Sequence, residues 1–381
     1  MDIQNIADEE VNNQDNYTSS PKVSFSYRVS IRSTDGSVKN YSEQTMLSYY
    51  KNKDNPNFKS TNYSINFASE EDADAAIEQY KADIMQEGDE IVDGSETVIY
   101  TLQPQASLTV IDQSTGEVKA IVGGRGDKTA SKTLNRATDT TRQPGSTFKI
   151  LAAYSAALDA GGLTLASVQD DAPYTYAGAN GKSVNNYDRR YRGFTTLREA
   201  ITDSINIVTV KTLAQAGVSL GWQYVQEYGF TTVDSRDMNE ALALGGITQG
   251  VSNLELTAAY AAIANQGTYI KPKFYTKILD HDGNVLIDNT TPESHTVIKD
   301  TTAWLLTSAM EDVMTSGTGT SAYFGSSMAQ AGKSGTTTSS RDALFAGYTP
   351  YYTCAVWGAT MIMPCRKVPI QTIQNVSGKL L

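Results

Sequence analysis

A serine and a lysine near the middle of the chain have the types and the spacing needed for nucleophilic catalysis. Ser146 and Lys149 stand three positions apart in Pro-Gly-Ser-Thr-Phe-Lys, at the start of a stretch with helical periodicity to about residue 160. Side chains three positions apart on a first helical turn project to the same side, so we expect the hydroxyl and the amine to hydrogen-bond. The amine can serve as a base only if burial or a second cation lowers its pKa from about 10.4. The alternative is a serine that caps a helix, followed by a surface lysine.

A second polar motif lies some sixty residues further on, in Asp-Ser-Ile-Asn. Ser204 and Asn206 interrupt a helical stretch that starts with a capping box at Thr196 and Glu199 and resumes near residue 207. At such a break, the hydroxyl can relay a proton and the amide can hold an amide of a substrate. The alternative is a cap at which the helix restarts.

A third motif, Lys-Ser-Gly-Thr, reads as part of a strand. Lys333 supplies a positive charge for a carboxylate, and Gly335 allows a ligand or another backbone to approach closely. Alternation places these two residues on one face of the strand and Ser334 and Thr336 on the other. By itself, the segment is equally consistent with a polar edge strand.

Composition restricts the chemistry further. The chain has two histidines, His281 in a hairpin turn and His295 after a loop, so a serine nucleophile must find its base outside a Ser-His-Asp triad. Two cysteines, Cys354 and Cys365, cannot form a disulfide framework, and no cluster has zinc-ligand spacing. We therefore expect no metal and no cofactor.

Length and charge define the class of protein. With 381 residues, 40% hydrophobic and 19% charged, the chain should fold into about two domains. A net charge of −11 disfavours nucleic acid as a partner. No apolar run approaches the roughly 20 residues of a membrane span, and the N-terminus does not resemble a signal peptide.

The periodicity of the first 103 residues predicts a small α+β domain. A polar helix over residues 1–15 should precede strands at 23–31, 63–67 and 96–102, with a hairpin at Asp35-Gly36 and helices at 42–50 and 69–87. From residue 104 the pattern of residues changes, and we expect a second, larger α+β domain that runs to residue 358. It should contain a hairpin at 107–122, helices at 254–264 and 302–315, a hairpin at 270–287, and three successive antiparallel strands at 329–335, 344–348 and 352–357.

The order of the three motifs, Ser-x-x-Lys, Ser-x-Asn and Lys-Ser-Gly, resembles the signature of penicillin-binding proteins and serine β-lactamases. The segments around them are similar to bifunctional class A penicillin-binding proteins over residues 104–358. These segments are Arg142-Gln143-Pro144-Gly145-Ser146, Asn186-Tyr187-Asp188-Arg189-Arg190-Tyr191-Arg192-Gly193, Thr196-Leu197-Arg198-Glu199-Ala200, Ala243-Leu244-Gly245-Gly246, Ala258-Ala259-Tyr260-Ala261-Ala262 and Phe345-Ala346-Gly347-Tyr348-Thr349-Pro350.

The resemblance implies a transpeptidase fold, with an antiparallel sheet flanked by helices, and a role for each motif. Ser146 would form an acyl-enzyme with the D-Ala-D-Ala end of a peptidoglycan stem peptide and pass the acyl group to an amine of a neighbouring stem. Lys149 would be the base. The second motif would shuttle protons and hold the substrate, and the third would bind the terminal carboxylate. The oxyanion hole would be formed by the N–H groups of Ser146 and Thr336. β-Lactam antibiotics would bind at the same serine.

Two alternatives remain. A β-lactamase or D,D-carboxypeptidase shares the acylation machinery but passes the acyl group to water; a β-lactamase Glu-x-x-x-Asn segment is absent between the second and third motifs. A non-catalytic β-lactam sensor or scaffold domain could share the fold.

The resemblance also implies segments that this sequence lacks. Family members carry a signal anchor and a glycosyltransferase domain upstream, which would place the parent protein at the extracytoplasmic face of the bacterial membrane. Residues 359–381 form an atypical tail with neither helical nor strand periodicity, where members continue with a segment and a helix that cover the sheet. We expect this tail to leave one face of the sheet exposed.

Overall fold

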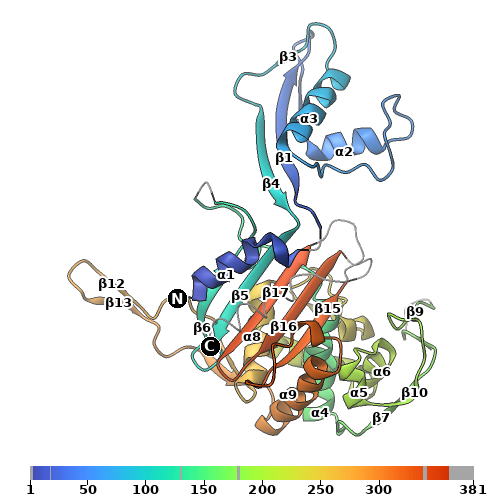
Figure 1. Ribbon diagram of the computed structural model, residues 1–381, viewed down its shortest axis with the longest axis vertical. Helices are drawn as coiled ribbons and strands as arrows, with labels where there is room; N and C mark the ends of the chain where they lie inside the picture. Colours follow the sequence, from blue (N-terminus) through green and yellow to red (C-terminus); the bar gives the residue numbers. More distant parts are fainter. Residues whose placement is uncertain (1–2, 18, 129–130, 178–180, 338–340, 360–381) are drawn as a thin grey trace. The chain divides into compact units, whose positions relative to one another are not determined.

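The computed structural model describes residues 3–17, 19–128, 131–177, 181–337 and 341–359, which form two compact units (Figure 1). The smaller unit comprises residues 19–105 and 125–127, and the larger comprises residues up to 18, 106–124 and those from 128 onward. The atypical tail predicted over residues 359–381 lies almost wholly outside the described residues. None of the described helices is long and apolar enough to cross a membrane.

The smaller unit is a sheet covered by two helices. Its central strand alternates buried and exposed side chains, with Phe25, Tyr27, Val29 and Ile31 in the core. Its elements are β1 (Lys22–Arg32), β2 (Val38–Ser42), β3 (Glu90–Ile91), β4 (Thr97–Gln103), α2 (Glu43–Lys51) and α3 (Glu70–Ile84), and β2, β3 and β4 each pair antiparallel with β1. The prediction of a strand at residues 63–67 is wrong. Only Phe67 pairs, in an isolated bridge to β1, because the other residues of this alternating segment have no partner strand.

The larger unit is built on a five-stranded sheet in the order β15-β16-β17-β5-β6. The strands are β15 (Ala331–Thr336), β16 (Asp342–Tyr348), β17 (Tyr352–Ala359), β5 (Gln105–Asp112) and β6 (Glu117–Val122). The β15/β16, β16/β17 and β5/β6 pairs are antiparallel, which confirms the predicted run of three strands and the hairpin predicted at residues 107–122.

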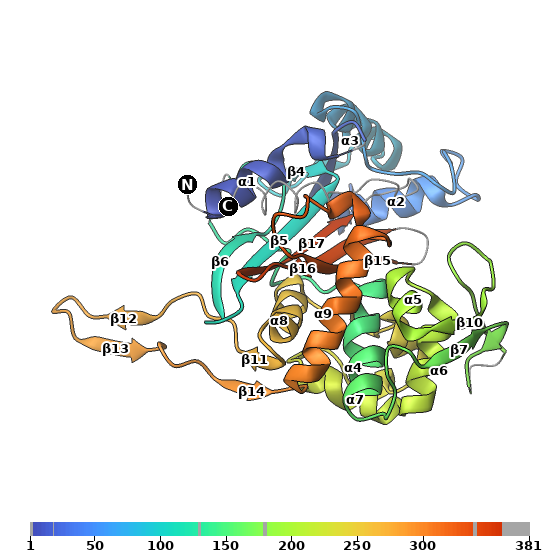
Figure 2. The same ribbon diagram turned by 60° about the horizontal axis from the view of Figure 1, so that its bottom comes forward.

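Helices pack on both faces of this sheet (Figure 2). On one face, α8 (Asn253–Ala264) and α9 (Asp300–Thr315) join the inward side chains of the strands in the main hydrophobic core. Behind them lie α4 (Ser155–Asp159), α5 (Leu197–Thr202), α6 (Asn206–Ala216) and α7 (Val218–Glu227). The predicted capping box at Thr196 and Glu199 is confirmed, and the helix predicted at residues 254–264 begins with a second capping box at Ser252.

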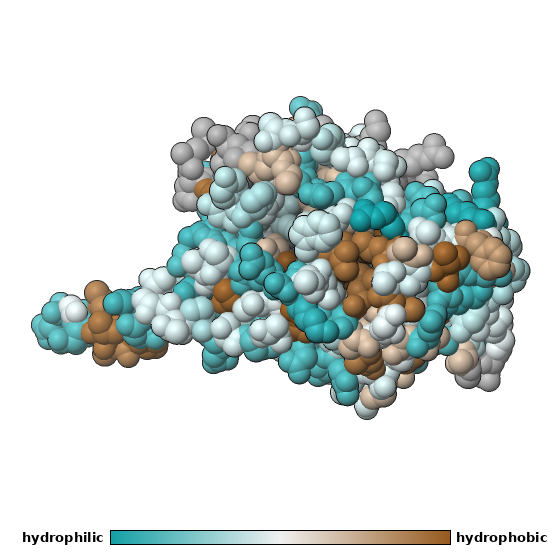
Figure 3. Space-filling model, turned by 90° about the horizontal axis from the view of Figure 1, so that it is seen from below, coloured by the Kyte–Doolittle hydropathy of each residue, from teal (hydrophilic) through white to brown (hydrophobic). Residues whose placement is uncertain are grey.

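The remaining strands form two-stranded ribbons. They are β7 (Val168–Asp171) with β10 (Gly193–Thr196), β8 (Tyr174–Thr175) with β9 (Ser183–Val184), β11 (Thr268–Ile270) with β14 (Ser294–Thr296), and β12 (Lys277–Leu279) with β13 (Val285–Asp288). Short 3-10 turns occur at Gln14–Asn16, Ser235–Asp237, Glu240–Leu244 and Thr320–Ala322. The β12–β13 hairpin exposes apolar side chains, which form the brown patch on the projecting arm in Figure 3.

The N-terminal helix α1 (Ile3–Asn12) departs from the predicted domain division, which grouped it with residues 1–103. It packs instead on the second face of the five-stranded sheet, where Ile6, Ala7 and Val11 are buried against side chains of β5, β6, β16 and β17. The side-chain amide of Gln4 accepts a hydrogen bond from the N–H of Ile121 (2.9 Å) and donates to its carbonyl (3.1 Å) on the edge strand β6. Burial and edge pairing therefore make α1 part of the larger unit.

This packing predicts that Ile6→Ala lowers the free energy of unfolding of the larger unit by about 3 kcal/mol, because a fully buried side chain is removed. All three tryptophans, Trp222, Trp304 and Trp357, lie in the larger unit, so tryptophan fluorescence during urea unfolding reports on that unit alone. The half-exposed Ile287 is the matched control, and Ile287→Ala should change stability by less than about 0.5 kcal/mol. Equal effects of the two substitutions would show that α1 does not stabilise the sheet.

Candidate active site

The first motif begins in a 3-10 turn, Gly145–Thr147, and continues into a π-helix, Lys149–Tyr154, before α4. The single regular helix predicted from residue 146 is therefore wrong in its detail. The expectation that Ser146 caps the helix is also wrong: Pro144 holds the position before the turn, and no side chain caps it. The wider π-helical turn, of a kind often found at functional sites, buries Lys149 completely, with 0% of its surface exposed.

The turn that carries Ser146 lies directly against β15. Gly145 has a φ of +55°, and a Cβ atom built on it would lie 2.8 Å from the carbonyl oxygen of Thr336. Gly335 is equally tight, because its Cβ would lie 2.8 Å from the carbonyl oxygen of Pro144. Only glycines permit this approach, which brings the backbone of the Gly145–Thr147 turn against the end of the third motif.

Ser204 ends α5 in an unusual way for a serine. The N–H of Ile205 donates to the carbonyl of Ala200 and the N–H of Ser204 donates to that of Ile201, which is the Schellman arrangement. Its left-handed position is normally glycine, but here Ser204 has a φ of +56°. A residue with a Cβ is strained there by about 1–2 kcal/mol. The strain places the serine hydroxyl between two lysines.

The two lysine amines converge on this hydroxyl. The Nζ of Lys149 donates to the Oγ of Ser204 (3.2 Å), to the Ser204 carbonyl (2.6 Å) and to the Oδ1 of Asn206 (2.6 Å). The Nζ of Lys333 donates to the same Oγ (2.9 Å) and to the carbonyl of Ser334 (3.1 Å). Both lysines are fully buried, and within the described residues neither has a carboxylate partner.

Burial without a counter-charge lowers the pKa of both amines. Loss of hydration, reinforced by the nearby charge of Lys333, holds the pKa of Lys149 well below its usual 10.5. Burial alone lowers the pKa of Lys333 to about 7. A lowered pKa is what allows a lysine amine to be neutral and to accept a proton near neutral pH.

The third motif divides between the two faces of β15 as its alternation predicts. Lys333 and Gly335 are buried, whereas Ser334 is half-buried and Thr336 is exposed. The hydroxyl of Ser334 donates to the Oγ1 of Thr318 (2.8 Å). Thr318 lies in a Ser-Gly-Thr-Gly-Thr loop and was not anticipated, since its sequence carries no spacing signal.

The structure thus brings Lys149, Ser204, Asn206 and Lys333 into one hydrogen-bonded cluster, with Ser146 on the adjoining turn. One predicted contact is wrong. The amine of Lys149 hydrogen-bonds to the Ser-x-Asn motif rather than to the hydroxyl of Ser146, because α6 and the π-helix bury the lysine side chain in that direction.

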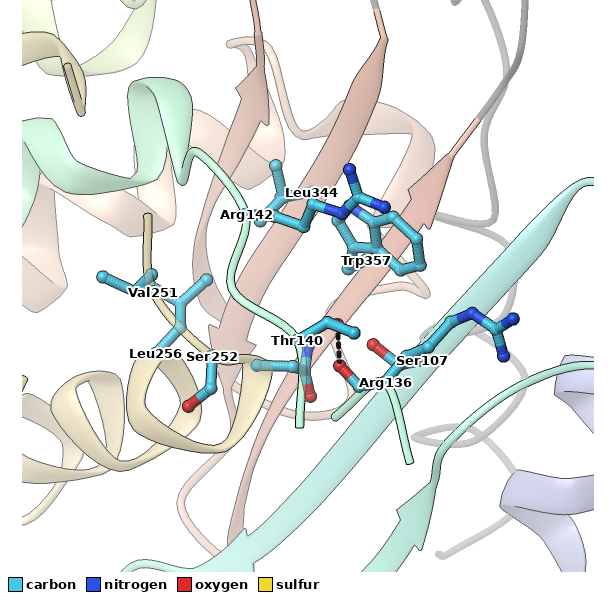
Figure 4. Close-up of a pocket in the computed structure, with 10 residues that line it drawn as sticks. Ser107, Arg136, Thr140, Arg142, Val251, Ser252, Leu256, Leu344 and Trp357 are labelled. Atoms are coloured by element: carbon cyan, nitrogen blue, oxygen red, sulfur yellow. Dashed lines mark hydrogen bonds between the residues drawn. The ribbon is translucent and has the colours of Figure 1, made fainter. Parts of the chain in front are cut away.

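A pocket in the larger unit lies beside the segment that precedes Ser146 and contains no residue of the three motifs. It is lined by Ser107, Arg136, Thr140, Arg142, Val251, Ser252, Asn253, Leu256, Leu344 and Trp357 (Figure 4). The guanidinium carbon of Arg142 lies 5.1 Å from the centre of the Trp357 ring, a cation–π contact. Three of the lining residues, Arg136, Thr140 and Arg142, belong to the segment that leads to Ser146.

Comparison with known proteins identifies the family of the larger unit. The sequence model of the family described as "Penicillin binding protein transpeptidase domain" matches residues 106–367. The chain is 38% identical over 267 residues to penicillin-binding protein 1A of Clostridium acetobutylicum (67% of this chain, 32% of that protein) and 40% identical over 259 residues to penicillin-binding protein 1F of Bacillus subtilis (66% and 35%). It therefore spans about a third of the length of these relatives.

Solved structures have the same fold. Penicillin-binding protein 1A of Haemophilus influenzae superposes with a TM-score of 0.63 at 23% identity, covering 77% of this chain and 56% of that one. The D,D-transpeptidase domain of the peptidoglycan glycosyltransferase from Eggerthella lenta superposes with a TM-score of 0.61 at 19% identity, covering 92% and 94%. Together with the family match over more than half of the sequence, these findings show that the chain belongs to the penicillin-binding protein transpeptidase family.

Proposed function

We propose that the chain is a serine-type D,D-transpeptidase that cross-links peptidoglycan stem peptides. The observation that carries the proposal is the pair of buried amines around the Ser204 hydroxyl, beside a turn that presents Ser146. A buried lysine with a lowered pKa can take the proton of a serine hydroxyl without a histidine. The two histidines lie in exposed positions, His281 in the β12–β13 turn and His295 on β14.

The reaction takes place in two transfers at one carbonyl. The Oγ of Ser146 attacks the carbonyl of the penultimate D-alanine, and its proton passes to Lys149. The peptide bond breaks, and the terminal D-alanine leaves with a proton returned through the Lys149, Ser204 and Lys333 cluster. An amine of a second stem peptide then attacks the ester, gives up its proton by the same route, and releases Ser146.

Binding groups for this substrate are available at the end of β15. The hydroxyl of Thr336, and that of Ser334 once it turns away from Thr318, can donate hydrogen bonds to the terminal carboxylate, assisted by the positive charge of Lys333. The N–H groups of Ser146 and Thr336 stabilise the oxyanion. Such donors contribute about 3 kcal/mol each to a transition state.

Hydrolysis is less well supported than transfer. A β-lactamase needs a base that activates water after acylation. The Glu-x-x-x-Asn segment typical of β-lactamases is absent between the second and third motifs. A D,D-carboxypeptidase would use the same acyl-enzyme with water as acceptor. The lysine pair joined through Ser204 argues against an inert scaffold domain, which needs no base.

The same serine should react with β-lactams, which mimic the D-Ala-D-Ala end. PonA1 of Mycobacterium tuberculosis, which has the same fold with a TM-score of 0.61, has been solved in complex with penicillin V. Stem peptides of peptidoglycan lie outside the cytoplasmic membrane, so we place the parent protein at the extracytoplasmic face.

Covalent labelling tests the nucleophile. We expect a fluorescent penicillin to label the wild-type chain at Ser146 and Ser146→Ala to abolish labelling without lowering stability, because the hydroxyl caps no helix. Mass analysis of the labelled peptide identifies the site. A label on a peptide that excludes Ser146 would contradict the assignment, and release of the label within minutes would favour the hydrolase.

The pH dependence of acylation tests the lysines. Lys149→Ala should remove nearly all acylation because the base is lost. In Lys333→Met, loss of the repelling charge stabilises the Lys149 ammonium and raises the pKa of Lys149, so the acid limb of the acylation profile should move to higher pH. Stopped-flow labelling from pH 5 to pH 10 measures both. An acid limb that stays in place would show that Lys149 is not the titrating base.

A further inference from the structure

The helix that carries Asn206 has no cap of its own. Ile205 holds the N-cap position of α6, and its apolar side chain cannot accept a hydrogen bond from the first N–H groups of the helix. The side-chain Oδ1 of Asn186 takes this role from another segment: it accepts from the N–H of Asn206 (3.0 Å) and from that of Ile207 (3.2 Å). Asn186 lies twenty residues earlier and is 2% exposed.

A buried carboxylate orients this asparagine. The Nδ2 of Asn186 donates to both carboxylate oxygens of Asp171 (2.8 and 3.0 Å) and to the carbonyl of Arg190 (2.8 Å). Because Nδ2 is held by acceptors, Oδ1 must point toward the helix. Asp171 is fully buried and also accepts from the N–H of Arg192 (2.9 Å).

The neighbouring residue fixes the side chain of Asn206 as well. The Nδ2 of Asn206 donates to the carbonyl of Asn185 (2.7 Å), which leaves its Oδ1 to accept from the amine of Lys149 (2.6 Å). Residues 185 and 186 therefore hold both the backbone and the amide of Asn206. The position of residues 185 and 186 therefore affects the hydrogen bonding of Lys149 through Asn206.

We propose that Asn186, held by Asp171, is a positioning residue that sets the start of α6 and thereby holds Asn206 against Lys149. The inference rests on the proposed acylation at Ser146 and extends it to a buried pair outside the three motifs. In the sequence, Asn186 stands out only as part of a segment that resembles class A penicillin-binding proteins. In the structure, its side chain accepts hydrogen bonds from the first N–H groups of α6.

Acylation kinetics test this role. Loss of the Oδ1 acceptor in Asn186→Ala should let the start of α6 shift and slow labelling of Ser146 by roughly 100-fold, the usual consequence of a displacement of about 1 Å. Within the described part of the chain, the charged group that faces Lys149 is Lys333 on β15, and the Lys149 ammonium is stabilised by the side-chain Oδ1 of Asn206. If Asn206 withdraws, the pKa of Lys149 falls further, so the acid limb should move to lower pH, opposite to Lys333→Met.

An exchange of the two side chains separates positioning from general stability. Asn186→Asp alone places two buried carboxylates together and should impair acylation strongly. Combined with Asp171→Asn, it restores one amide and one carboxylate, and acylation should recover to within about tenfold of wild type. Asn265→Ala is the control, because that amide also bonds a backbone carbonyl, of Thr268 (3.0 Å), at the far end of α8. It should leave the rate and the pH profile unchanged.

The outcomes distinguish this inference from the proposed function. A wild-type chain that is not acylated at all would overturn the proposed function itself. Wild-type acylation together with an unchanged rate and acid limb in Asn186→Ala would overturn the positioning role. So would an exchanged variant that unfolds at the wild-type urea concentration, by tryptophan fluorescence, yet labels as slowly as Asn186→Asp.

Discussion

The site depends on one physical constraint, the burial of two lysine amines around a single hydroxyl. Two ammonium groups cannot both stay charged in an apolar interior without a carboxylate, and the described residues supply none to Lys149 or Lys333. The pKa values of both amines must fall, through burial for Lys333 and through burial together with the charge of Lys333 for Lys149. In the proposed mechanism, this burial makes a base from a side chain that is normally a cation at neutral pH.

Much of the larger unit can be understood as support for this arrangement. Lys333 lies on β15 of the sheet, and Lys149 lies on the π-helical turn. Ser204 lies at the break between α5 and α6, in a left-handed conformation that is strained for a residue with a Cβ. Tight contacts at Gly145 and Gly335 allow the Gly145–Thr147 turn to lie against the strand. The strained and uncapped positions are held by packing and by hydrogen bonds from other segments, as Asn186 illustrates.

The sequence was sufficient for features that depend on local pattern. Alternating strands, capping boxes and the helix break at Ser204 could be predicted because short-range periodicity and capping chemistry determine them. Features that depend on distant partners could not. The place of α1 follows from burial against strands that lie about one hundred residues later (β5 and β6) and more than three hundred residues later (β16 and β17), and the strand expected at residues 63–67 lacks a partner. Lys149 turns toward Ser204 rather than Ser146 because of a π-helix, which the spacing of residues in the sequence did not predict.

The ionisation of Lys149 can be measured directly. In protein labelled with 13C at lysine Cε, the Cε resonance of each lysine follows its own protonation, and Lys149→Ala and Lys333→Met assign the two buried signals. We expect Lys149 to titrate well below 10.5, and to titrate at higher pH once Lys333 is replaced by Met. A Lys149 resonance that titrates at the ordinary value near 10.5, in folded protein, would contradict the claim that burial makes this lysine the base.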